Sequence, residues 1–444
     1  MLQQSWSLLE NGQKEGYKVA YTNARIIDPE SKLDIYGSLL TDSKVIADFG
    51  ESLFAGGVPS SVDEVIDCNG LVLMPGIVDI HVHFREPGQE YKETIYTGSR
   101  SAAAGGVTTV VCQPNTVPPI DSVILARYLK YRAFETSHVN VEFYAAITKS
   151  GNKLTEMALL KEAGAVGFTD DGLPVMNAHI MRQALKYSSM LNVPIAQHAE
   201  DLNLSAGGCI NEGIVSEELG VTGIPSVSEA VMVNRDILLM QDIANVHYHV
   251  LHVSSKDSLR AIADAKKRGI NITCEVAPHH FTLTENDVRE HNSMAKMNPP
   301  LRSEEDRLAM IEGLRSGIID CIATDHAPHD VGSKDLPLGD SAFGIVGLET
   351  LLPLTLELYY NQNLDLSDVL GKLTYKPADI IHVPRGRIRK NFVADLTLVD
   401  LEHSWEVDIS KFASKSKNSP FSKRIVKGRA VRTVVSGKTV YVLR

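Results

Sequence analysis

Histidine and acidic residues follow short apolar segments at several points along the chain. His81 and His83 form an H-x-H pair at the end of the run GIVDIHV. Because residues i and i+2 of a strand point to the same side, both imidazoles can bind one ion. Imidazole nitrogen suits zinc, and a carboxylate can complete the ligand set. The first of these segments therefore indicates a zinc site.

Further acids and histidines follow later apolar runs and could hold a second ion. His198 and His252 are the candidates for that ion, Asp171 could bridge the two ions, and Asp325 could contact the first. Adjacent residues on a strand point in opposite directions, so only one of Asp170 and Asp171 should be a ligand. A single buried histidine is more often a core residue than a ligand. An ordered series at successive strand ends is a much more specific signal than one H-x-H pair.

The segments that carry these residues alternate with helix-like stretches. Eight apolar runs are found, at 76–82, 107–112, 139–147, 165–169, 193–197, 246–253, 270–276 and 318–323. Between them, apolar residues recur at helical spacing. This alternation predicts an α/β fold, a (β/α)8 TIM-type barrel over 73–389, whose strand ends would carry the catalytic groups. An open doubly wound sheet is the alternative, but no Gly-rich phosphate turn follows the first run.

The two ends of the chain have a different pattern. Residues 17–72 and 390–444 read as short strands separated by turns, and Ser436–Gly437 sits between two alternating runs as a tight hairpin would. We expect these segments to form one small β-sandwich domain. Residues 1–16 show no clear pattern and are treated as an N-terminal extension without an assigned role.

Composition excludes several classes of protein. The formal net charge is −11, which argues against nucleic-acid binding because phosphate contacts need clustered Lys and Arg. No apolar run has the length of a membrane span, and the first residues lack the pattern of a secretory signal. Five widely spaced cysteines without a C-x-x-C pair predict free thiols and a reducing, cytoplasmic location.

Taken together, the motifs resemble one known family. They are PGIVDIHVHFREPG (75–88), QPNT (113–116), GFTDDG (167–172), AQHAE (196–200), LHVSS (251–255), APHH (277–280), NPPLR (298–302), TDHAPH (324–329) and FGIVGLET (343–350). The chain resembles the amidohydrolase superfamily and, within it, the bacterial class I dihydroorotases, from about residue 17 to the C-terminus. H-x-H alone marks the superfamily, whereas HFREPG, PNT, NPPLR and TDHAPH together mark the dihydroorotases.

The resemblance implies a role for each matching residue. His81, His83 and Asp325 would bind one zinc, His198 and His252 a second, and Asp171 would be the bridging acid. Asp325 would also be the catalytic acid–base. The substrate would be held by Arg85, Asn115, Asn298 and His329. The guanidinium of Arg85 can grip a carboxylate with two hydrogen bonds. Gln113 stands where the family more often has Met, and we expect little effect.

The resemblance also implies an activity and partners. The activity is the zinc-dependent, reversible hydrolysis of the cyclic amide of dihydroorotate to N-carbamoyl-aspartate, the third step of pyrimidine biosynthesis. One or two zinc ions per subunit are expected, together with a homodimer and an association with aspartate transcarbamoylase. No nucleic acid or membrane partner is expected.

Two other functions are kept as alternatives. Another cyclic-amide hydrolase, an allantoinase or hydantoinase, would usually have lysine at the position of Asp171. An inactive scaffold for aspartate transcarbamoylase would typically have lost metal ligands, and here every ligand position is filled. Residues 330–344, rich in Gly, Asp, Ser and Pro, read as a loop over the barrel mouth, either a lid that orders on substrate or a passive surface loop.

Overall fold

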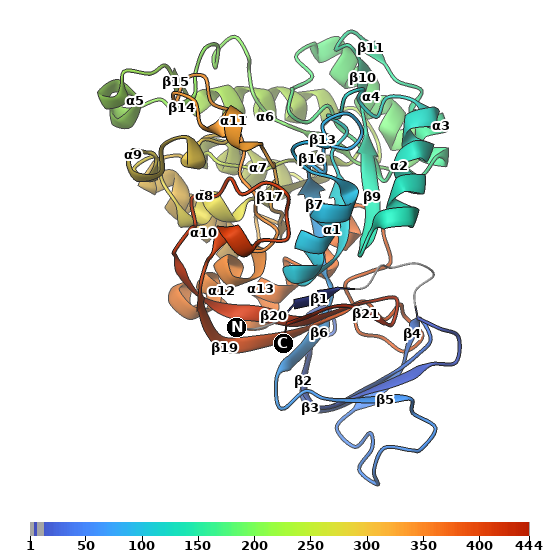
Figure 1. Cartoon of the computed structure of the whole chain (residues 1–444). Helices are drawn as coiled ribbons and strands as arrows, with labels where there is room; N and C mark the ends of the chain where they lie inside the picture. Colours follow the sequence, from blue (N-terminus) through green and yellow to red (C-terminus); the bar gives the residue numbers. More distant parts are fainter. Residues whose placement is uncertain (1–3, 7–12, 444) are drawn as a thin grey trace.

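The computed structural model describes residues 4–6 and 13–443 of the chain, and eight parallel strands form its centre. They follow one another around a barrel in sequence order (Figure 1). The strands are β7 (Ile77–Val82), β8 (Val107–Cys112), β9 (Asn140–Ala145), β12 (Gly167–Phe168), β13 (Ile195–Gln197), β16 (Tyr248–Val250), β17 (Ile272–Val276) and β18 (Cys321–Ile322). The barrel is closed beyond β18 by a parallel bridge between Val82 and His326.

Helices separate the barrel strands along the chain. The main ones are α1 (Ile95–Ala104), α2 (Val123–Thr136), α3 (Met157–Glu162), α4 (Ala178–Leu191), α6 (Val227–Met240), α7 (Lys256–Lys267), α10 (Glu304–Arg315) and α12 (Leu351–Gln362). Local chemistry sets their starts: Thr94 and Thr97 form a capping box at α1, and the Ser255 hydroxyl accepts from the Ser258 N–H at α7. The strands they surround are fully buried, as in β8, and their apolar side chains build the core.

Strands from both ends of the chain pair in a second sheet beneath the barrel (Figure 1). Its order is β1-β21-β20-β19-β6-β2-β3-β4, with β5 paired to β2. The strands are β1 (Gln4–Trp6), β2 (Lys18–Asp28), β3 (Leu33–Asp42), β4 (Val45–Gly50), β5 (Glu64–Asp67), β6 (Val72–Pro75), β19 (Leu396–Glu406), β20 (Ile425–Val435) and β21 (Lys438–Leu443). β6 lies between β2, which is parallel to it, and β19, which is antiparallel. Ser436 and Gly437 form the predicted hairpin turn between β20 and β21.

The sheet is joined to the barrel through buried hydrogen bonds. The Thr397 hydroxyl donates to the Gly106 carbonyl at 2.7 Å, and the Thr433 hydroxyl donates to the Ala103 carbonyl at 2.7 Å. Gly106 has φ +83°, and a Cβ there would meet Thr397 Cγ2 at 2.8 Å. Glycine is therefore required where the first barrel helix turns into β8.

The connection between β19 and β20 leaves the sheet and packs against the barrel. Its apolar residues Val407, Phe412 and Phe421 share a buried cluster with Ile345 and Val346, which follow β18. Polar residues of the same connection also reach the barrel. The C-terminal part of the chain therefore supports the barrel mouth as well as the sheet.

The predicted (β/α)8 barrel is confirmed, together with a small β-rich domain built from both termini. That domain was predicted as a β-sandwich, and its described strands pair in one nine-stranded sheet. The strand Gln4–Trp6, which pairs with β21, was not expected from the sequence. Residues 1–3 and 7–12 of the predicted extension lie outside the described residues. Within the part of the chain that the structure describes, no helix has the length and apolar character of a membrane span.

Candidate active site

One cavity of about 220 Å³ at the barrel mouth gathers nearly all the residues singled out from the sequence. Its lining is His83, Arg85, Asn115, Asp171, Gly172, His198, His252, Asn298, Asp325, Ala327, His329, Phe343 and Gly344. His81 lies behind this lining, is fully buried and contacts Asp171. A larger hollow of about 500 Å³ adjoins the cavity, since Asn115, Asp171 and Gly172 line both. These three residues therefore form a wall that the two hollows share.

Four donor atoms lie at the spacing of a tetrahedral metal site. His81 Nε2 is 3.3 Å from Asp171 Oδ2 and 3.6 Å from Asp325 Oδ1. His83 Nε2 is 3.3 Å and 3.1 Å from the same two oxygens. Four ligands held about 2.0 Å from one ion at tetrahedral angles lie about 3.3 Å apart. These two histidines and two carboxylates therefore fit one zinc-like ion.

A second donor set shares Asp171 through its other oxygen. Asp171 Oδ1 is 3.5 Å from His198 Nδ1 and 3.4 Å from His252 Nε2. The two imidazole nitrogens are 2.9 Å apart. Asp171 Oδ1 is buried and makes no hydrogen bond to any residue that the structure describes. A buried carboxylate oxygen needs a compensating partner, and a cation between these donors would provide it.

In three of these histidines, the ring nitrogen that points away from the donor cluster lies within hydrogen-bond distance of a polar side chain. His81 Nδ1 lies 2.5 Å from Glu275 Oε1, and His83 Nδ1 lies 2.8 Å from Asn115 Oδ1. His198 Nε2 lies 3.1 Å from Glu200 Oε2. An outer hydrogen bond of this kind fixes ring orientation and leaves the other nitrogen free for a metal. Glu275 and Glu200 belong to the machinery of the site, although the sequence did not single them out.

Both of these acids are strongly ionised. Burial alone would raise the pKa of Glu275, but the neighbouring His81 and His249 hold it at about 2. Burial likewise opposes ionisation of Glu200, and the hydrogen bond with His198 lowers the pKa to about 2. A carboxylate in its charged form is the better acceptor for an imidazole N–H. Each acid can therefore fix its histidine throughout the neutral pH range.

The lining of the same cavity includes a buried cation, Arg85. Arg85 is 7% exposed and forms no ion pair with any acid that the structure describes. Its Nε donates to the Pro328 carbonyl at 3.3 Å, and Nη2 lies 3.3 Å from His329 Nε2. Burial lowers the pKa of Arg85 to about 10, so it remains charged at neutral pH. Burial and the nearby Arg85 lower the pKa of His329 to about 2, which keeps that imidazole neutral.

Three of the site residues have left-handed backbone conformations. The φ angles are +61° at Arg85, +30° at His252 and +49° at Asp325. Non-glycine residues avoid this region because it costs about 1 kcal/mol or more, and such residues concentrate at functional sites. The backbone therefore turns sharply just after β7, β16 and β18, and these three side chains line the cavity.

The loop 330–344 covers one side of the cavity and is held by two buried lysines. Lys334, 1% exposed, donates to the carbonyls of Lys296 (3.1 Å), Ala342 (2.9 Å) and Gly344 (3.1 Å). Lys296 donates to the Leu338 carbonyl at 2.7 Å and lies over the Phe343 ring. The loop contains a short helix, α11 (Val331–Lys334). It is thus a fixed wall of the cavity in this structure, and whether it moves as a lid stays a prediction.

Several polar residues near the strand ends point away from the donor cluster. Asp170 turns away from the cavity and accepts from the Thr148 N–H at 3.0 Å, whereas Asp171 joins the donor cluster. His247 and His249 both contact Thr273 Oγ1 at 2.9 Å, away from the cavity lining. Asn298 lies at the site, where its amide donates to Glu200 Oε2 at 2.9 Å.

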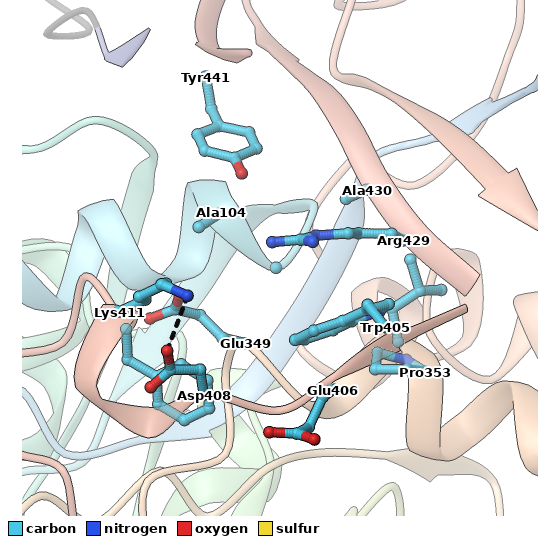
Figure 2. A pocket seen from close by; sticks show the side chains of 13 residues that line it. Ala104, Glu349, Pro353, Trp405, Glu406, Asp408, Lys411, Arg429, Ala430 and Tyr441 are labelled. Atoms are coloured by element: carbon cyan, nitrogen blue, oxygen red, sulfur yellow. Dashed lines mark ion pairs between the residues drawn. The ribbon is translucent and has the colours of Figure 1, made fainter. Parts of the chain in front are cut away.

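A second pocket lies far from these donors, where β19 and β20 meet α1 and α12 (Figure 2). It has a volume of about 100 Å³. The Arg429 guanidinium stacks 4.4 Å from the Trp405 ring, and Lys411 pairs with Asp408 at 2.8 Å. Its lining contains no histidine or cysteine, and three of its charged groups already have protein partners. The cavity at the barrel mouth is therefore the candidate active site.

The barrel and its cluster of converging histidines and acids define an enzyme of the amidohydrolase superfamily. Residues 70–258 match the family model described as dihydro-orotase-like. The chain is 77% identical to the dihydroorotase of Wolbachia sp. subsp. Brugia malayi and 70% identical to that of Ehrlichia chaffeensis, each alignment covering 99% of both chains. The L-hydantoinase of Arthrobacter aurescens has a similar structure, with a TM-score of 0.86 and 26% identity over 95% of this chain and 96% of the other. The chain belongs to the dihydroorotase family.

Proposed function

We propose that the chain hydrolyses the ring amide of dihydroorotate to N-carbamoyl-aspartate, reversibly, as a step of pyrimidine biosynthesis. The observation that carries this proposal is the placement of a buried, acid-free Arg85 in the same cavity as the donor cluster. A buried guanidinium without a carboxylate partner favours a carboxylate ligand. Dihydroorotate carries one carboxylate beside its cyclic amide. The relatives named dihydroorotase support the same substrate.

Zinc is the metal that we propose for the donor cluster. His81, His83, Asp171 and Asp325 would hold one ion, and His198, His252 and Asp171 a second. When bound, these ions would activate water at neutral pH and polarise the amide carbonyl. Nitrogen and carboxylate donors at these spacings suit zinc better than calcium or magnesium, which prefer oxygen alone.

The protein's own residues would orient the substrate and move the proton. Arg85 and His329 would bind the substrate carboxylate, and Asn115 and Asn298, which line the same cavity, would add hydrogen bonds to the substrate. Asn115 uses its oxygen on His83, so its amide N–H groups remain to donate to the substrate. Asp325 Oδ1 faces His83, so Oδ2 can accept the proton from the attacking water. The same carboxyl group would then deliver that proton to the ring nitrogen as the C–N bond breaks.

One experiment tests activity and metal together on the purified, lone chain. Bound zinc is measured by elemental analysis, and hydrolysis is assayed with dihydroorotate, hydantoin and allantoin in parallel. We expect bound zinc and a preference for dihydroorotate. A preference for hydantoin or allantoin would instead support the other cyclic-amide hydrolases. A chain that binds zinc but turns over only with aspartate transcarbamoylase added would show that this partner is needed.

The division of the chain and its location are further parts of the proposal. We propose residues 73–389 as the barrel and residues 17–72 with 390–444 as the β-rich domain. The cavity lining lies within the first of these ranges, which supports the division. A cytoplasmic location is supported by the five cysteines, which are all buried and free.

A further inference from the structure

The pocket between the terminal sheet and the barrel contains two opposite charges that do not contact each other. Arg429 on β20 carries one, and Glu349, which precedes α12, carries the other. Within the described residues, no ion pair of 4.0 Å or less joins them. Figure 2 shows the Arg429 guanidinium extending over the Trp405 ring toward the side of the pocket that carries Glu349 and Lys411. A molecule placed between the two charges could contact both.

The Arg429 guanidinium is held by stacking and keeps its hydrogen-bond donors. It lies 4.4 Å from the Trp405 ring, whose indole N–H donates to the Gly428 carbonyl at 3.2 Å. Arg429 forms no ion pair or side-chain hydrogen bond with any residue that the structure describes. Burial lowers the pKa of Arg429, as expected for a cation that is short of negative charge. The edge of the guanidinium can therefore bind a carboxylate with two hydrogen bonds.

Glu349 is short of positive charge in the same pocket. Its Oε1 accepts from the Ser101 hydroxyl at 2.9 Å and from the N–H groups of Ala413 at 2.7 Å and Ser414 at 3.3 Å. Burial outweighs these donors and the positive charge of Lys417, and it raises the pKa of Glu349 to about 7. A cation in direct contact would lower that pKa instead. Oε2 is therefore left for a cationic group from outside the chain.

The remaining charges and the size of the pocket limit what can bind. Lys411 and Asp408 neutralise each other in an ion pair of 2.8 Å. The volume is about 100 Å³, which corresponds to about three water molecules at about 30 Å³ each. Lys411 and Glu406 are exposed, so one end of a bound molecule can reach solvent. A small molecule with one negative and one positive group therefore fits better than a simple anion or cation.

We propose that this pocket binds a small α-amino acid, with its carboxylate on Arg429 and its ammonium group on Glu349. The carboxylate accepts two hydrogen bonds from the guanidinium edge, and the ammonium group donates to Glu349 Oε2. A short side chain packs against Leu352 and Pro353, which also line the pocket. The bound molecule links the terminal sheet to the barrel. Its site shares no lining residue with the cavity at the barrel mouth.

Isothermal titration calorimetry of the full chain with three matched small molecules tests the proposal. L-Alanine carries both charged groups, whereas propionate lacks the ammonium group and ethylamine lacks the carboxylate. L-Alanine should bind with a Kd of about 1 mM, and the other two at least about tenfold more weakly, because each leaves one charge of the pocket uncompensated. Absence of L-alanine binding would overturn the proposal. Equal affinity for propionate would also overturn it, because the pocket would then be a simple anion site.

Substitutions locate the bound amino acid. Arg429→Met and Glu349→Gln should each weaken L-alanine binding at least about tenfold, because each removes one of the two charges. Lys427→Met is the matched control, since Lys427 lies on the same strand outside the lining and pairs with the exposed Glu402. Arg85→Met removes the cation of the barrel mouth and should leave L-alanine binding unchanged. Loss of binding in Arg85→Met, with binding retained in Arg429→Met, would place the amino acid at the mouth and overturn the proposal.

Trp405 gives a local readout of the same event. The chain has two tryptophans, Trp6 and Trp405, so Trp6→Phe leaves Trp405 as the single tryptophan emitter. L-Alanine should change its emission with the Kd found by calorimetry, because the carboxylate binds the cation that is stacked on this ring. Arg429→Met in the same background should abolish the change. Circular dichroism and thermal melting establish that each variant is folded. Calorimetric binding without any change in Trp405 emission would contradict the proposed location.

Discussion

The barrel mouth and the outer face of helix α2 depart from the usual distribution of polar and apolar residues in opposite directions. At the mouth, His81, His83 and Asp171 are at most 4% exposed although all three are polar. On the outer face of α2, Ile124 and Phe134 are apolar and at least 65% exposed. Both arrangements cost free energy in an isolated chain, the first through desolvation and the second through contact of apolar surface with water.

The difference between the two regions lies in how the surroundings are built. The mouth is fixed by hydrogen bonds from distant segments, such as Glu275 on His81 and Asn115 on His83. The outer face of α2 belongs to one surface helix, with α1 and α3 beside it. The first arrangement is suited to reaction chemistry, which demands fixed atoms, whereas the second leaves apolar area accessible at the surface. Substitutions in one region should therefore leave the function of the other unchanged.

The largest effect is expected for Asp325→Asn, which removes the proton-transferring carboxylate. Turnover of dihydroorotate should fall about 10⁴-fold, while folding remains that of the wild type. Steady-state kinetics and circular dichroism measure the two properties. Asp170→Asn is the matched control, because Asp170 faces Thr148 and not the cavity. Turnover near the wild-type rate in Asp325→Asn would remove its assigned role.

Replacing each of two arginines by methionine separates the regions directly. Arg85→Met should lower kcat/KM for dihydroorotate about 100-fold, mainly through KM, because the substrate carboxylate loses its buried partner. Arg127→Met, on the outer face of α2, should leave KM unchanged, because Arg127 does not line the cavity. An unchanged KM in Arg85→Met would exclude that residue from the carboxylate site.

Glu275→Gln should weaken metal binding without changing the ligands themselves. Loss of the charged acceptor on His81 Nδ1 should lower zinc affinity about 10- to 100-fold. Competition with a chelator measures this affinity independently of turnover. If zinc affinity is unchanged, Glu275 only packs beneath the site.

Lys334→Met should loosen the loop wall of the cavity. The variant loses three hydrogen bonds to loop and neighbouring carbonyls, and KM for dihydroorotate should rise about tenfold. Cleavage of residues 330–344 by protease should also become faster, whereas the exposed Lys186→Met should behave as the wild type. Equal protease sensitivity of Lys334→Met and the wild type would show that the loop is held by other contacts.

The smallest effect is a pH dependence of stability at the same lysine. Burial lowers the pKa of Lys334 to about 7, from an ordinary value of 10.5. The unfolded chain therefore binds more protons than the folded chain between these values, and stability rises with pH. The difference in melting temperature between the wild type and Lys334→Met should shift by about 2 °C in favour of the wild type from pH 7 to pH 9. No change across this range would contradict the lowered pKa.

The sequence predicted the candidate ligands because each follows an apolar run directly. Strand alternation even separated Asp171 from Asp170. Several barrel strands are shorter than expected, among them β12 at Gly167–Phe168 and β18 at Cys321–Ile322. Threonine side chains explain the early ends: the Asp171 N–H donates to Thr169 Oγ1 at 3.0 Å, and the His326 N–H donates to Thr324 Oγ1 at 3.0 Å. These local bonds replace the ladder bonds of a regular strand.

The supporting residues could not be predicted from local pattern. Glu275 is 194 positions from His81, and its only signal was an acid within the apolar run ITCEV. The burial of Lys334 could not be predicted from the sequence, because a lysine in a polar loop is ordinarily solvent-exposed. Asn418 accepts a hydrogen bond from the His329 N–H at 3.1 Å. It lies in residues 390–444, which the sequence assigned to the β domain and not to the barrel. Such contacts depend on tertiary distances that neither spacing nor composition encodes.

The position of β6 between β2 and β19 has a consequence for how the polypeptide is made. During translation, β2 and β6 leave the ribosome before any barrel strand, and β19 emerges only after the whole barrel has been synthesised. One side of β6 therefore has unpaired peptide groups throughout elongation, and these could pair with other nascent chains. A stalled or prematurely terminated product would retain this open edge even with a complete set of barrel strands. Loss of β19 would thus favour aggregation of the released fragment.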